Sequence, residues 1–359
     1  MSTNDDVAAA RELLDLVNGS WIAQACYVTA RLGIADLLAA GPRTAEDLAA
    51  ATGTHAPALR RLLAALGSVD VCHQHADGSF EMTRIGRTLR DDVPCSMRAW
   101  TLQWGGEAWR VWANLLHSVK TGQSARSLIT GDTGFAHLER DPQAAQIFNQ
   151  AMVDLTRLAA MDIARAYDFA GKQVMDVGGG YGELLAQILI THPDARGVLF
   201  DMPHAISKAR DHLGGRNLEG RCEFVAGDFF ASVPAGSDVY VLKTVIHDWA
   251  DEQALDILRT CRGAMSPQAR LLIIERLMPE RLEPSAENRA LARVDLHMLV
   301  ALGAQERTQA QMETLLEAVG LKTLRRIETA SEFQILEASA PGDARPAAAA
   351  AAGPVPLSR

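Results

Sequence analysis

A histidine directly follows an apolar, strand-like run in the segment KTVIHDWADEQ, Lys243–Gln253. The run Val239–Ile246 contains one lysine and stops at His247, and Asp248 comes next. Imidazole has an unperturbed pKa of about 6.5, so it exchanges a proton readily near neutral pH. A lone histidine after a strand is more often structural, and an acid beside it is as often a helix cap or a solvated group. The neighbouring motifs must therefore decide whether His247 does chemistry.

A glycine-rich loop, VMDVGGGYGE, follows a strand-like segment and opens a helix. Gly178, Gly180 and Gly182 allow the backbone to turn sharply and to approach a ligand closely. Asp201 ends the next strand, where an acidic group can bind ribose hydroxyls. A dinucleotide-binding loop would place its third glycine where this chain has Glu183. A carboxylate in the first helical turn disfavours a pyrophosphate and suits a cation. S-adenosylmethionine, which carries a sulfonium and no phosphate, therefore fits better than a dinucleotide.

The third and fourth strands offer further contacts to an adenine ring. Asp228 in the segment GDFF can accept a hydrogen bond, and Phe229 can stack on the ring. Lys243 lies in an otherwise apolar run and needs a partner if it is buried, which an adenine edge beside Asp228 would provide. The alternatives are a turn with two core phenylalanines and a lysine that extends to solvent.

These residues belong to a region in which strands and helices alternate. From Gln173 onward the strand-like segments QVMDV, GVLFDM, CEFVAG, DVYVLKTV and RLLIIE are separated by helical stretches. A helix and a closing strand, EFQILEA, follow. This alternation predicts an α/β domain built on a parallel, doubly wound sheet, over residues 171–338.

The N-terminal half has a different, mainly helical pattern. Residues 8–95 show helical spacing and then a hairpin with an Asp77–Gly78 turn, as in a winged helix. Residues 96–170 form a helical region that contains WGGEAW and four nearby tryptophans. Such a cluster is more often core or subunit interface, but the two glycines also allow a substrate pocket. Residues 339–359, rich in alanine and proline, are predicted to be disordered.

Composition limits the class of protein. The chain has 359 residues, 48% hydrophobic residues and a formal net charge of −9, which argues against a nucleic-acid or anionic-membrane partner. The five cysteines include no CxxC pair, and no group of ligands has metal-site spacing, so we expect reduced thiols and no metal. We see neither a signal peptide nor an apolar run that could span a bilayer, and expect a cytoplasmic protein.

Several motifs together resemble the small-molecule O-methyltransferases of the caffeate and acetylserotonin type and their bacterial natural-product counterparts. The matching segments are DVGGGYG, FDMPHAI, GDFF, LKTVIHDW, IIERLMPE and DLHMLVALGAQERT, within residues 12–338. The resemblance implies a C-terminal Rossmann-like, S-adenosylmethionine-dependent domain with a mostly parallel seven-stranded sheet. It also implies an N-terminal winged-helix domain that forms a homodimer and closes over the partner's active site.

The resemblance further assigns roles to individual residues. His247 is implied to be the general base, flanked by the carboxylates of Glu275 and Glu306. The implied cofactor contacts are Gly178, Asp201, Asp228, Phe229 and Lys243. The expected substrate-binding residues are Met152, Met298, Trp104 and Asp248. Leu155 stands where the plant enzymes often have a polar residue, so their particular substrates are not transferred to this chain.

The expected reaction moves a methyl group from S-adenosylmethionine to a hydroxyl group and leaves S-adenosylhomocysteine. A phenol has a pKa of about 10, so full proton transfer to an ordinary histidine beforehand would be uphill by roughly 5 kcal/mol. We therefore expect the proton to leave as the new bond forms. Methionines and tryptophans near the pocket favour a small, flat, hydroxylated aromatic acceptor of secondary metabolism.

Three alternatives remain open from the sequence. A winged-helix transcription regulator is disfavoured because the candidate recognition helix offers only Arg60 and Arg61 as basic residues. An NAD-dependent oxidoreductase is disfavoured by Glu183. A relative that keeps the fold and cofactor but hydroxylates or decarboxylates its substrate is the nearest alternative, although His247 and the paired glutamates favour methylation.

Overall fold

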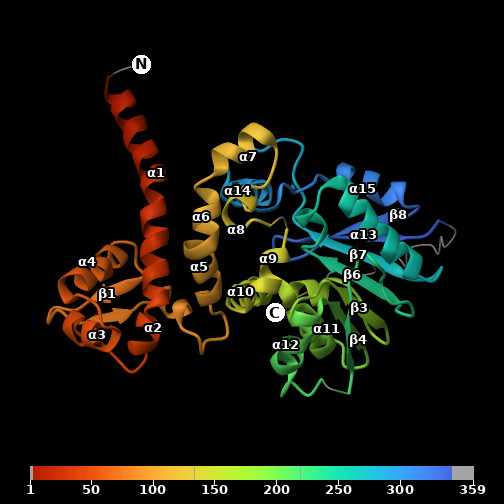
Figure 1. The fold of residues 1–359 in the computed structure, drawn as a ribbon, viewed down its shortest axis with the longest axis horizontal. Coiled ribbons are helices and arrows are strands. Elements are labelled where there is room, and N and C mark those ends of the chain that lie inside the picture. The colour runs from red at the N-terminus through yellow and green to blue at the C-terminus, as the bar shows by residue number, and fades with distance from the viewer. Residues whose placement is uncertain (1–2, 133, 219, 342–359) are drawn as a thin grey trace, which may run out of the picture.

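The computed structural model describes residues 3–132, 134–218 and 220–341 of the chain. A helical N-terminal region lies at one end and an α/β region at the other, with a group of helices between them (Figure 1). Among the described residues, no helix is both long and apolar enough to cross a membrane.

The N-terminal region packs short helices and a hairpin around one small core. Its elements are α1 Thr3–Arg31, α2 Ile34–Leu37, α3 Ala45–Thr52, α4 Ala56–Gly67, β1 Cys72–Gln74, β2 Phe80–Met82 and the 3₁₀ helix η1 Gly86–Leu89. The two strands pair antiparallel, and Gly78 has a φ of 87° in the turn between them, which confirms the expected hairpin. Ile34, Leu48, Leu63 and Phe80 are fully buried in the core.

The middle of the chain is a series of helices that leads to the sheet. Its elements are α5 Arg98–Gln103, the π-helix η2 Trp104–Ala108, α6 Trp109–Trp112, α7 Leu115–Thr121, α8 Ser127–Thr130, α9 Ala136–Arg140 and α10 Pro142–Ala166. The π-helix lies against α1 so closely that a side chain on Gly105 would overlap Tyr27. Helix α10 starts at Asp141, whose carboxylate accepts the N–H groups of Gln143 and Ala144.

Seven strands form one sheet in the order β5-β4-β3-β6-β7-β9-β8. The strands are β3 Gln173–Val177, β4 Arg196–Asp201, β5 Cys222–Ala226, β6 Val239–Lys243, β7 Arg270–Glu275, β8 Lys322–Glu328 and β9 Gln334–Ser339. Strands β3 to β7 pair in parallel, whereas β9 pairs antiparallel with both β7 and β8. The predicted fold class, a mostly parallel seven-stranded α/β sheet, is confirmed.

Helices cover both faces of this sheet and create two cores. The remaining elements are α11 Glu183–Thr191, α12 Pro203–Leu213, the 3₁₀ helix η3 Ile246–Asp248, α13 Asp251–Ala264, α14 Ala286–Leu302 and α15 Gln309–Ala318. Residues of α10, α11 and α12 pack on one face, and those of α13 and α15 pack on the other. The strand order reverses at β3 and β6, the place where such sheets open a ligand crevice at their carboxyl ends.

Three details differ from the sequence expectations. Strand β6 ends at Lys243 rather than continuing to Ile246, because Thr244 has a φ of 50° and turns the chain. Strand β8 was not predicted, since its largely exposed side chains lack an apolar alternation. Strand β9 reaches Ser339, inside the segment predicted to be disordered, and residues 342–359 of that segment lie outside the described part of the chain. The domain boundaries at 95, 170 and 338 stay predictions.

We expect the core between α11 and the sheet to dominate stability. Leu185 is fully buried there, whereas Ile190 on the same helix is 50% exposed. Leu185→Ala should lower the free energy of unfolding by about 2–5 kcal/mol, because it removes buried methyl groups and leaves a cavity. Ile190→Ala, the matched control, should change it by less than about 0.5 kcal/mol. Urea denaturation at fixed protein concentration measures both, and equal losses would contradict this account of the core.

Candidate active site

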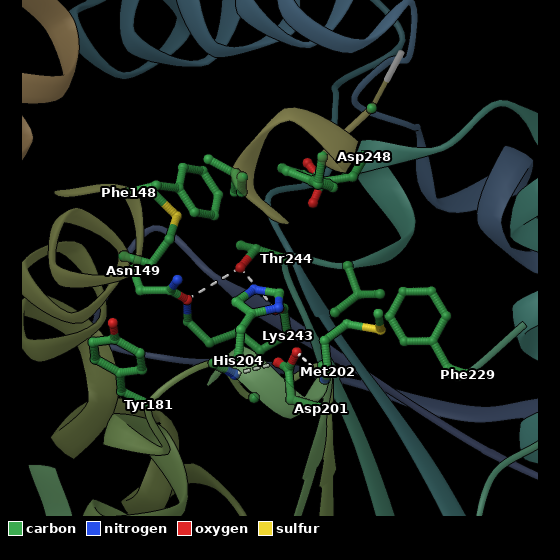
Figure 2. A pocket seen from close by; sticks show the side chains of 18 of the residues that line it. Phe148, Asn149, Tyr181, Asp201, Met202, His204, Phe229, Lys243, Thr244 and Asp248 are labelled. Atoms are coloured by element: carbon green, nitrogen blue, oxygen red, sulfur yellow. Dashed lines mark hydrogen bonds between the residues drawn. The ribbon is translucent and has the colours of Figure 1, made fainter. Parts of the chain in front are cut away.

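A cavity of about 450 Å³ opens at the carboxyl ends of the central strands. Its lining includes the residues after β3, β4, β5 and β6 and one face of α10. Asp201 and Met202 lie at one end of this pocket and Asp248 lies at the other, with Phe148 and Phe229 on opposite sides (Figure 2). The volume suits an elongated small molecule rather than a single ion.

The glycine loop after β3 forms the floor of the cavity. Gly178 has a φ of 71° and Gly180 a φ of 60°, which other residues adopt only with strain. A side chain on Gly178 would come within 3.1 Å of Val245 and 3.4 Å of Phe229, so it would fill the space above the loop. The N–H of Gly180 donates to Asp201 Oδ2 at 2.7 Å. Asp201 therefore holds the loop open and also borders the cavity.

Glu183 has a different role from the one expected. Its carboxylate contacts Arg157 at 3.2 Å, His212 at 2.7 Å and Arg216 at 2.9 Å. Burial alone would raise the pKa of Glu183, but hydrogen bonds from His212 and Arg216 and the charges of both arginines lower it to about 2. The carboxylate is thus neutralised within the protein, and it joins α10, α11 and α12 instead of serving mainly as the partner of a cationic ligand.

All five residues predicted to contact the cofactor line the cavity. They come from four neighbouring strand ends and are Gly178, Asp201, Asp228, Phe229 and Lys243. The carboxylate of Asp228 also accepts the N–H of Phe230 at 2.8 Å, which orders the turn that presents Phe229. Several other lining residues were not predicted from the sequence, and they are Asn149, Tyr181, Met202 and His204. The first of these sits on α10, far from the glycine loop in sequence.

Lys243 already has partners inside the protein. Its Nζ donates to Thr156 Oγ1 at 3.2 Å and lies 4.8 Å from the centre of the Phe333 ring. Burial, followed by the nearby charge of Arg276, lowers the pKa of Lys243 to about 8. The adenine contact was predicted because a buried lysine needs a partner. Thr156 and the Phe333 ring already provide partners within the protein. That contact therefore stays a prediction, although Lys243 does border the cavity.

His247 sits in the 3₁₀ turn after β6, and two side chains hold this turn in place. Glu275 Oε1, at the end of β7, faces the N–H groups of three successive residues, Val245 at 3.2 Å, Ile246 at 3.1 Å and His247 at 3.4 Å. On the other side of the turn, the buried guanidinium of Arg307 donates to the carbonyl groups of Ile246 and Trp249 at 2.9 and 2.8 Å. The turn is thus fixed from both its donor and its acceptor side.

The imidazole of His247 is surrounded by carboxylates. Its Nδ1 lies 2.7 Å from Glu306 Oε1 and 3.7 Å from Glu275 Oε2, and its Nε2 lies 3.5 Å from Asp248 Oδ1. Burial alone would lower the pKa of His247, but the charges of Glu306, Glu275 and Asp248 outweigh it and raise the pKa to about 10. Glu306 is therefore the glutamate that orients the ring, whereas Glu275 mainly orients the turn.

Burial and the nearby carboxylates also shift the pKa of Asp248. Burial raises the pKa of Asp248 to about 7, with Glu275 and Glu306 adding to the rise and His247 opposing it. His247, Glu275 and Glu306 could each offer one ligand atom to a metal ion, since these atoms lie within 4.8 Å of one another. Binding an ion would compete with the His247–Glu306 hydrogen bond. The expectation that no metal is used stays a prediction.

The four predicted substrate-binding residues do not all reach the cavity. Met152 and Asp248 line it, whereas Met298 and Trp104 do not. Met298 is buried on α14. Trp104 packs against Trp100 and Trp112, with ring centres 5.4 and 5.8 Å apart, and against His297 at 4.8 Å. Trp100, Trp104 and Trp112 thus pack together outside the lining of the main cavity, whereas Trp109, the fourth tryptophan of the cluster, is exposed.

An aromatic wall near Asp248 was missed in the sequence. Phe135 packs on Phe148 and Trp249, with ring centres 5.4 and 6.0 Å apart, and Trp249 also contacts Phe230. All four rings border the cavity. One local signal was available, because Phe148 lies four residues before the predicted Met152 and so shares its face of a helix. Nothing local points to Phe135, which lies just before α9.

Comparisons with known proteins agree with this geometry. The O-methyltransferase domain model matches residues 112–322, and the O-methyltransferase dimerisation domain model matches residues 14–92. Phenazine O-methyltransferase PhzM of Lysobacter antibioticus is 43% identical over 327 residues, which cover 91% of this chain and 95% of that protein. Phenazine-1-carboxylate N-methyltransferase of Pseudomonas aeruginosa is 33% identical over 336 residues, covering 94% and 99%. The relatives thus include both O- and N-methyltransferases.

Solved structures show the same relationship. The crystal structure of LaPhzM has a TM-score of 0.89 at 42% identity and covers 92% of this chain and 99% of its own. NcsB1, an O-methyltransferase from neocarzinostatin biosynthesis, has a TM-score of 0.76 at 34% identity, with 89% and 95% coverage. That structure holds S-adenosylmethionine and 2-hydroxy-5-methyl naphthoic acid.

These findings confirm the predicted family, enzyme class and methyl-donor cofactor, and they favour them over an NAD-dependent oxidoreductase or a transcription regulator. The glycine loop and the acidic strand ends border the cavity, and His247 lies between Glu306 and Asp248, the latter at the edge of the cavity. The chain therefore belongs to the O-methyltransferase family, whose members transfer a methyl group from S-adenosylmethionine to small natural products.

Proposed function

We propose that this enzyme methylates a hydroxyl group of a small aromatic natural product, with His247 as the general base. The observation that carries the proposal is the position of His247, with Nδ1 on Glu306 and Nε2 beside Asp248, which borders the cavity. Because Nδ1 is occupied, Nε2 is the nitrogen that can receive a proton from a substrate. S-adenosylmethionine supplies an electrophilic methyl group, whose transfer leaves S-adenosylhomocysteine.

The electrostatics of the site match this task. A phenol has a pKa of about 10, and the carboxylates around His247 raise the pKa of its imidazole to about 10 as well. Proton transfer from a phenol to the neutral ring is then nearly balanced. A ring with this pKa is protonated in most of the free enzyme at neutral pH, so transfer starts from the neutral fraction, which grows as the pH rises. Once protonated, the imidazolium is stabilised by Glu306 and Glu275, so the base does not hold an isolated buried charge.

The cavity also suits the two ligands. We infer that Gly178, Asp201, Asp228, Phe229 and Lys243 hold the donor, because they gather at one set of strand ends. The rings of Phe135, Phe148 and Trp249, with Met152, form a wall on which a flat aromatic acceptor can pack. Asp248 borders this wall and can hydrogen-bond the acceptor, whereas Met298 and Trp104 would act from behind the wall.

An N-methyltransferase is the second candidate, because some relatives carry names of that kind. A ring nitrogen with a free lone pair has no proton to lose, so it does not need a buried base. The three carboxylates that raise the basicity of His247 therefore favour a hydroxyl acceptor. Incubation with methyl-labelled S-adenosylmethionine and matched phenols and aza-aromatics, followed by mass spectrometry, separates the two. Methylation of the nitrogen compounds alone would contradict the proposal.

We also propose that the enzyme works as a homodimer. The match to the dimerisation domain spans residues 14–92, and α1 extends away from the body of the molecule (Figure 1). Leu13, Leu16, Val17 and Trp21 on this helix are 61–77% exposed and share one face. A partner subunit would cover these side chains. A monomeric species in sedimentation experiments at micromolar concentration would contradict this.

His247→Gln should lower kcat by at least about 100-fold, because glutamine cannot accept the substrate proton. The dissociation constant for S-adenosylmethionine, measured by calorimetry, should stay within about threefold, since His247 does not line the main cavity. His73→Gln, which changes an exposed histidine on β1, is the matched control and should be fully active. Near-normal turnover by His247→Gln would remove the general-base role.

Glu306→Gln should change the pH dependence in a defined direction. Free enzyme with a protonated His247 cannot act as a base, so kcat/KM rises as pH increases through the pKa of His247. Removing the charge of Glu306 lowers that pKa, so the rising limb should move to lower pH while the plateau falls. Glu317→Gln, an exposed change on α15, should leave the profile unchanged. A shift to higher pH would contradict the assignment.

Asp201→Asn should weaken binding of S-adenosylmethionine by about tenfold or more, because it weakens a charge-assisted hydrogen bond to Gly180 and to a ribose hydroxyl. Asp211→Asn on α12, where the side chain is exposed, serves as the control. Calorimetry with S-adenosylhomocysteine measures both without turnover. Unchanged affinity in Asp201→Asn would place the ribose elsewhere.

A further inference from the structure

Two buried glutamates beside His247 each keep one oxygen without a partner. Glu275 uses Oε1 to accept backbone N–H groups, and Glu306 uses Oε1 to bind His247 Nδ1 at 2.7 Å. Among the described residues, Glu275 Oε2 and Glu306 Oε2 are fully enclosed and have no hydrogen-bond partner. The two side chains are 2% and 0% exposed. An unpaired oxygen on a buried carboxylate is costly, so two of them beside one imidazole indicate a ligand.

The atoms of this group lie at distances that suit one metal ion. Glu275 Oε2 is 3.7 Å from His247 Nδ1, and His247, Glu275 and Glu306 each place one possible ligand atom within 4.8 Å of the others. Two ligands of a tetrahedral zinc ion, each about 2.0–2.1 Å from the metal, lie about 3.3 Å apart. The 3.7 Å separation needs little change, whereas Nδ1 and Glu306 Oε1 would have to move apart by roughly 0.6 Å.

The donor set selects the kind of ion. An imidazole nitrogen with two carboxylates suits Zn²⁺ and its neighbours among the first-row transition metals, whereas Mg²⁺ and Ca²⁺ prefer oxygen ligands alone. The charges of Glu275 and Glu306 also balance a divalent cation on a neutral imidazole. Asp248 borders the cavity and lies 3.5 Å from His247 Nε2, so a carboxylate stands between the cavity and the buried ring where a cation would enter.

An ion on Nδ1 would decide which nitrogen of His247 carries a proton. A neutral imidazole has one N–H and one unprotonated nitrogen, and a metal ion binds the unprotonated one. The proton of the hydrogen bond between Nδ1 and Glu306 then leaves to solvent, and the remaining ring proton sits on Nε2. Nε2 is the nitrogen beside Asp248, on the side of the cavity. In this form it cannot accept a proton from a hydroxyl group.

We propose that His247 Nδ1, Glu275 Oε2 and Glu306 bind a divalent transition-metal ion of the Zn²⁺ type, and that this ion inhibits the enzyme. The inhibition rests on the proposed function, because it requires Nε2 of His247 to be the base, whereas the metal site itself does not. The ion takes no part in methyl transfer. It removes the base while the methyl donor stays bound, since none of the three ligands lines the main cavity.

Calorimetric titration of the enzyme–S-adenosylhomocysteine complex with ZnCl₂ tests the site without turnover. One Zn²⁺ per chain should bind, and MgCl₂ should give no comparable binding. Glu306→Gln and His247→Gln should each weaken the affinity for Zn²⁺ by at least about tenfold, because even the partners behind a metal ligand change affinity by that much. Both variants should still bind S-adenosylhomocysteine, which shows that they are folded.

Two other groups that could bind zinc provide the controls. His73 and His75 have ring centres 4.9 Å apart, and His75 Nε2 lies 3.5 Å from Glu81. Cys95 is an exposed thiol. In protein without an affinity tag, His75→Gln and Cys95→Ser should leave the tightest Zn²⁺ site unchanged. Loss of that site in either control would overturn the proposal.

Nitrogen-15 NMR of labelled histidine reports the state of the His247 ring directly. One equivalent of Zn²⁺ should give a ring with Nδ1 on the metal and the proton on Nε2. Saturating Zn²⁺ should lower kcat by at least about 100-fold, the scale of a lost general base, and a chelator should restore turnover. The dissociation constant for S-adenosylmethionine should stay within about threefold.

The possible outcomes separate the metal site from the role of the base. No binding of Zn²⁺, equal affinity in Glu306→Gln, or a metal-bound Nε2 would overturn the site. Equal binding of Mg²⁺ would show attraction to acidic charge alone and would overturn it as well. Zn²⁺ bound through Nδ1 with unchanged turnover would leave the metal site standing, but it would overturn both the inhibition and the role of His247 as the base.

Discussion

The buried carboxylate of Glu275 is the constraint on which the catalytic end of the molecule depends. Its Oε1 accepts the N–H groups of three successive residues after β6, a set of donors that compensates a buried carboxylate. In the same turn Thr244, a β-branched residue, has a φ of 50°. This left-handed backbone conformation costs a residue other than glycine about 1–3 kcal/mol. The turn brings the ring of His247 beside Asp248, which borders the cavity. Arg307 completes the turn from its carbonyl side, so chain direction at the base is set by β7 and the segment before α15 together.

The same region shows why an acidic environment helps a base. Each carboxylate near His247 raises the proton affinity of the ring, and together they overcome the effect of burial. Burial, with a further contribution from the charges of the neighbouring acids, raises the pKa of Glu275 and of Asp248. The site therefore carries less net negative charge than the number of its acidic side chains suggests. A cationic donor and a transient imidazolium are both compatible with such a site.

The sequence could locate site residues that lie at the end of a predicted strand, because the strand itself places them at the edge of the sheet. Gly178 follows β3, Asp201 ends β4 and Asp228 lies two residues after β5, so the sheet alone brings them to one edge. Contacts between distant segments could not be found in this way. Glu183 is neutralised by Arg157 from α10, and the division of roles between Glu275 and Glu306 depends on distances of 3.7 and 2.7 Å to one ring nitrogen. The edge strand β8 was not predicted because most of its side chains are exposed to solvent. Such a strand lacks the alternation of apolar and polar residues that identifies half-buried strands in a sequence.

Chemistry and selectivity come from different parts of this chain. The glycine loop, the proposed base His247 and its carboxylates lie on the sheet and on the segments between β6 and α15. Carboxylates that accept backbone N–H groups hold the loop and the turn, and the side chain of Glu306 holds the ring of His247. The walls that face an acceptor come from the helical region before β3, through Phe135, Phe148 and Met152. These side chains lie on segments separate in sequence from His247 and its carboxylates. A scaffold divided in this way can keep one binding site for the methyl donor while its acceptor pocket diverges, and the relatives of this chain carry the names of both O- and N-methyltransferases.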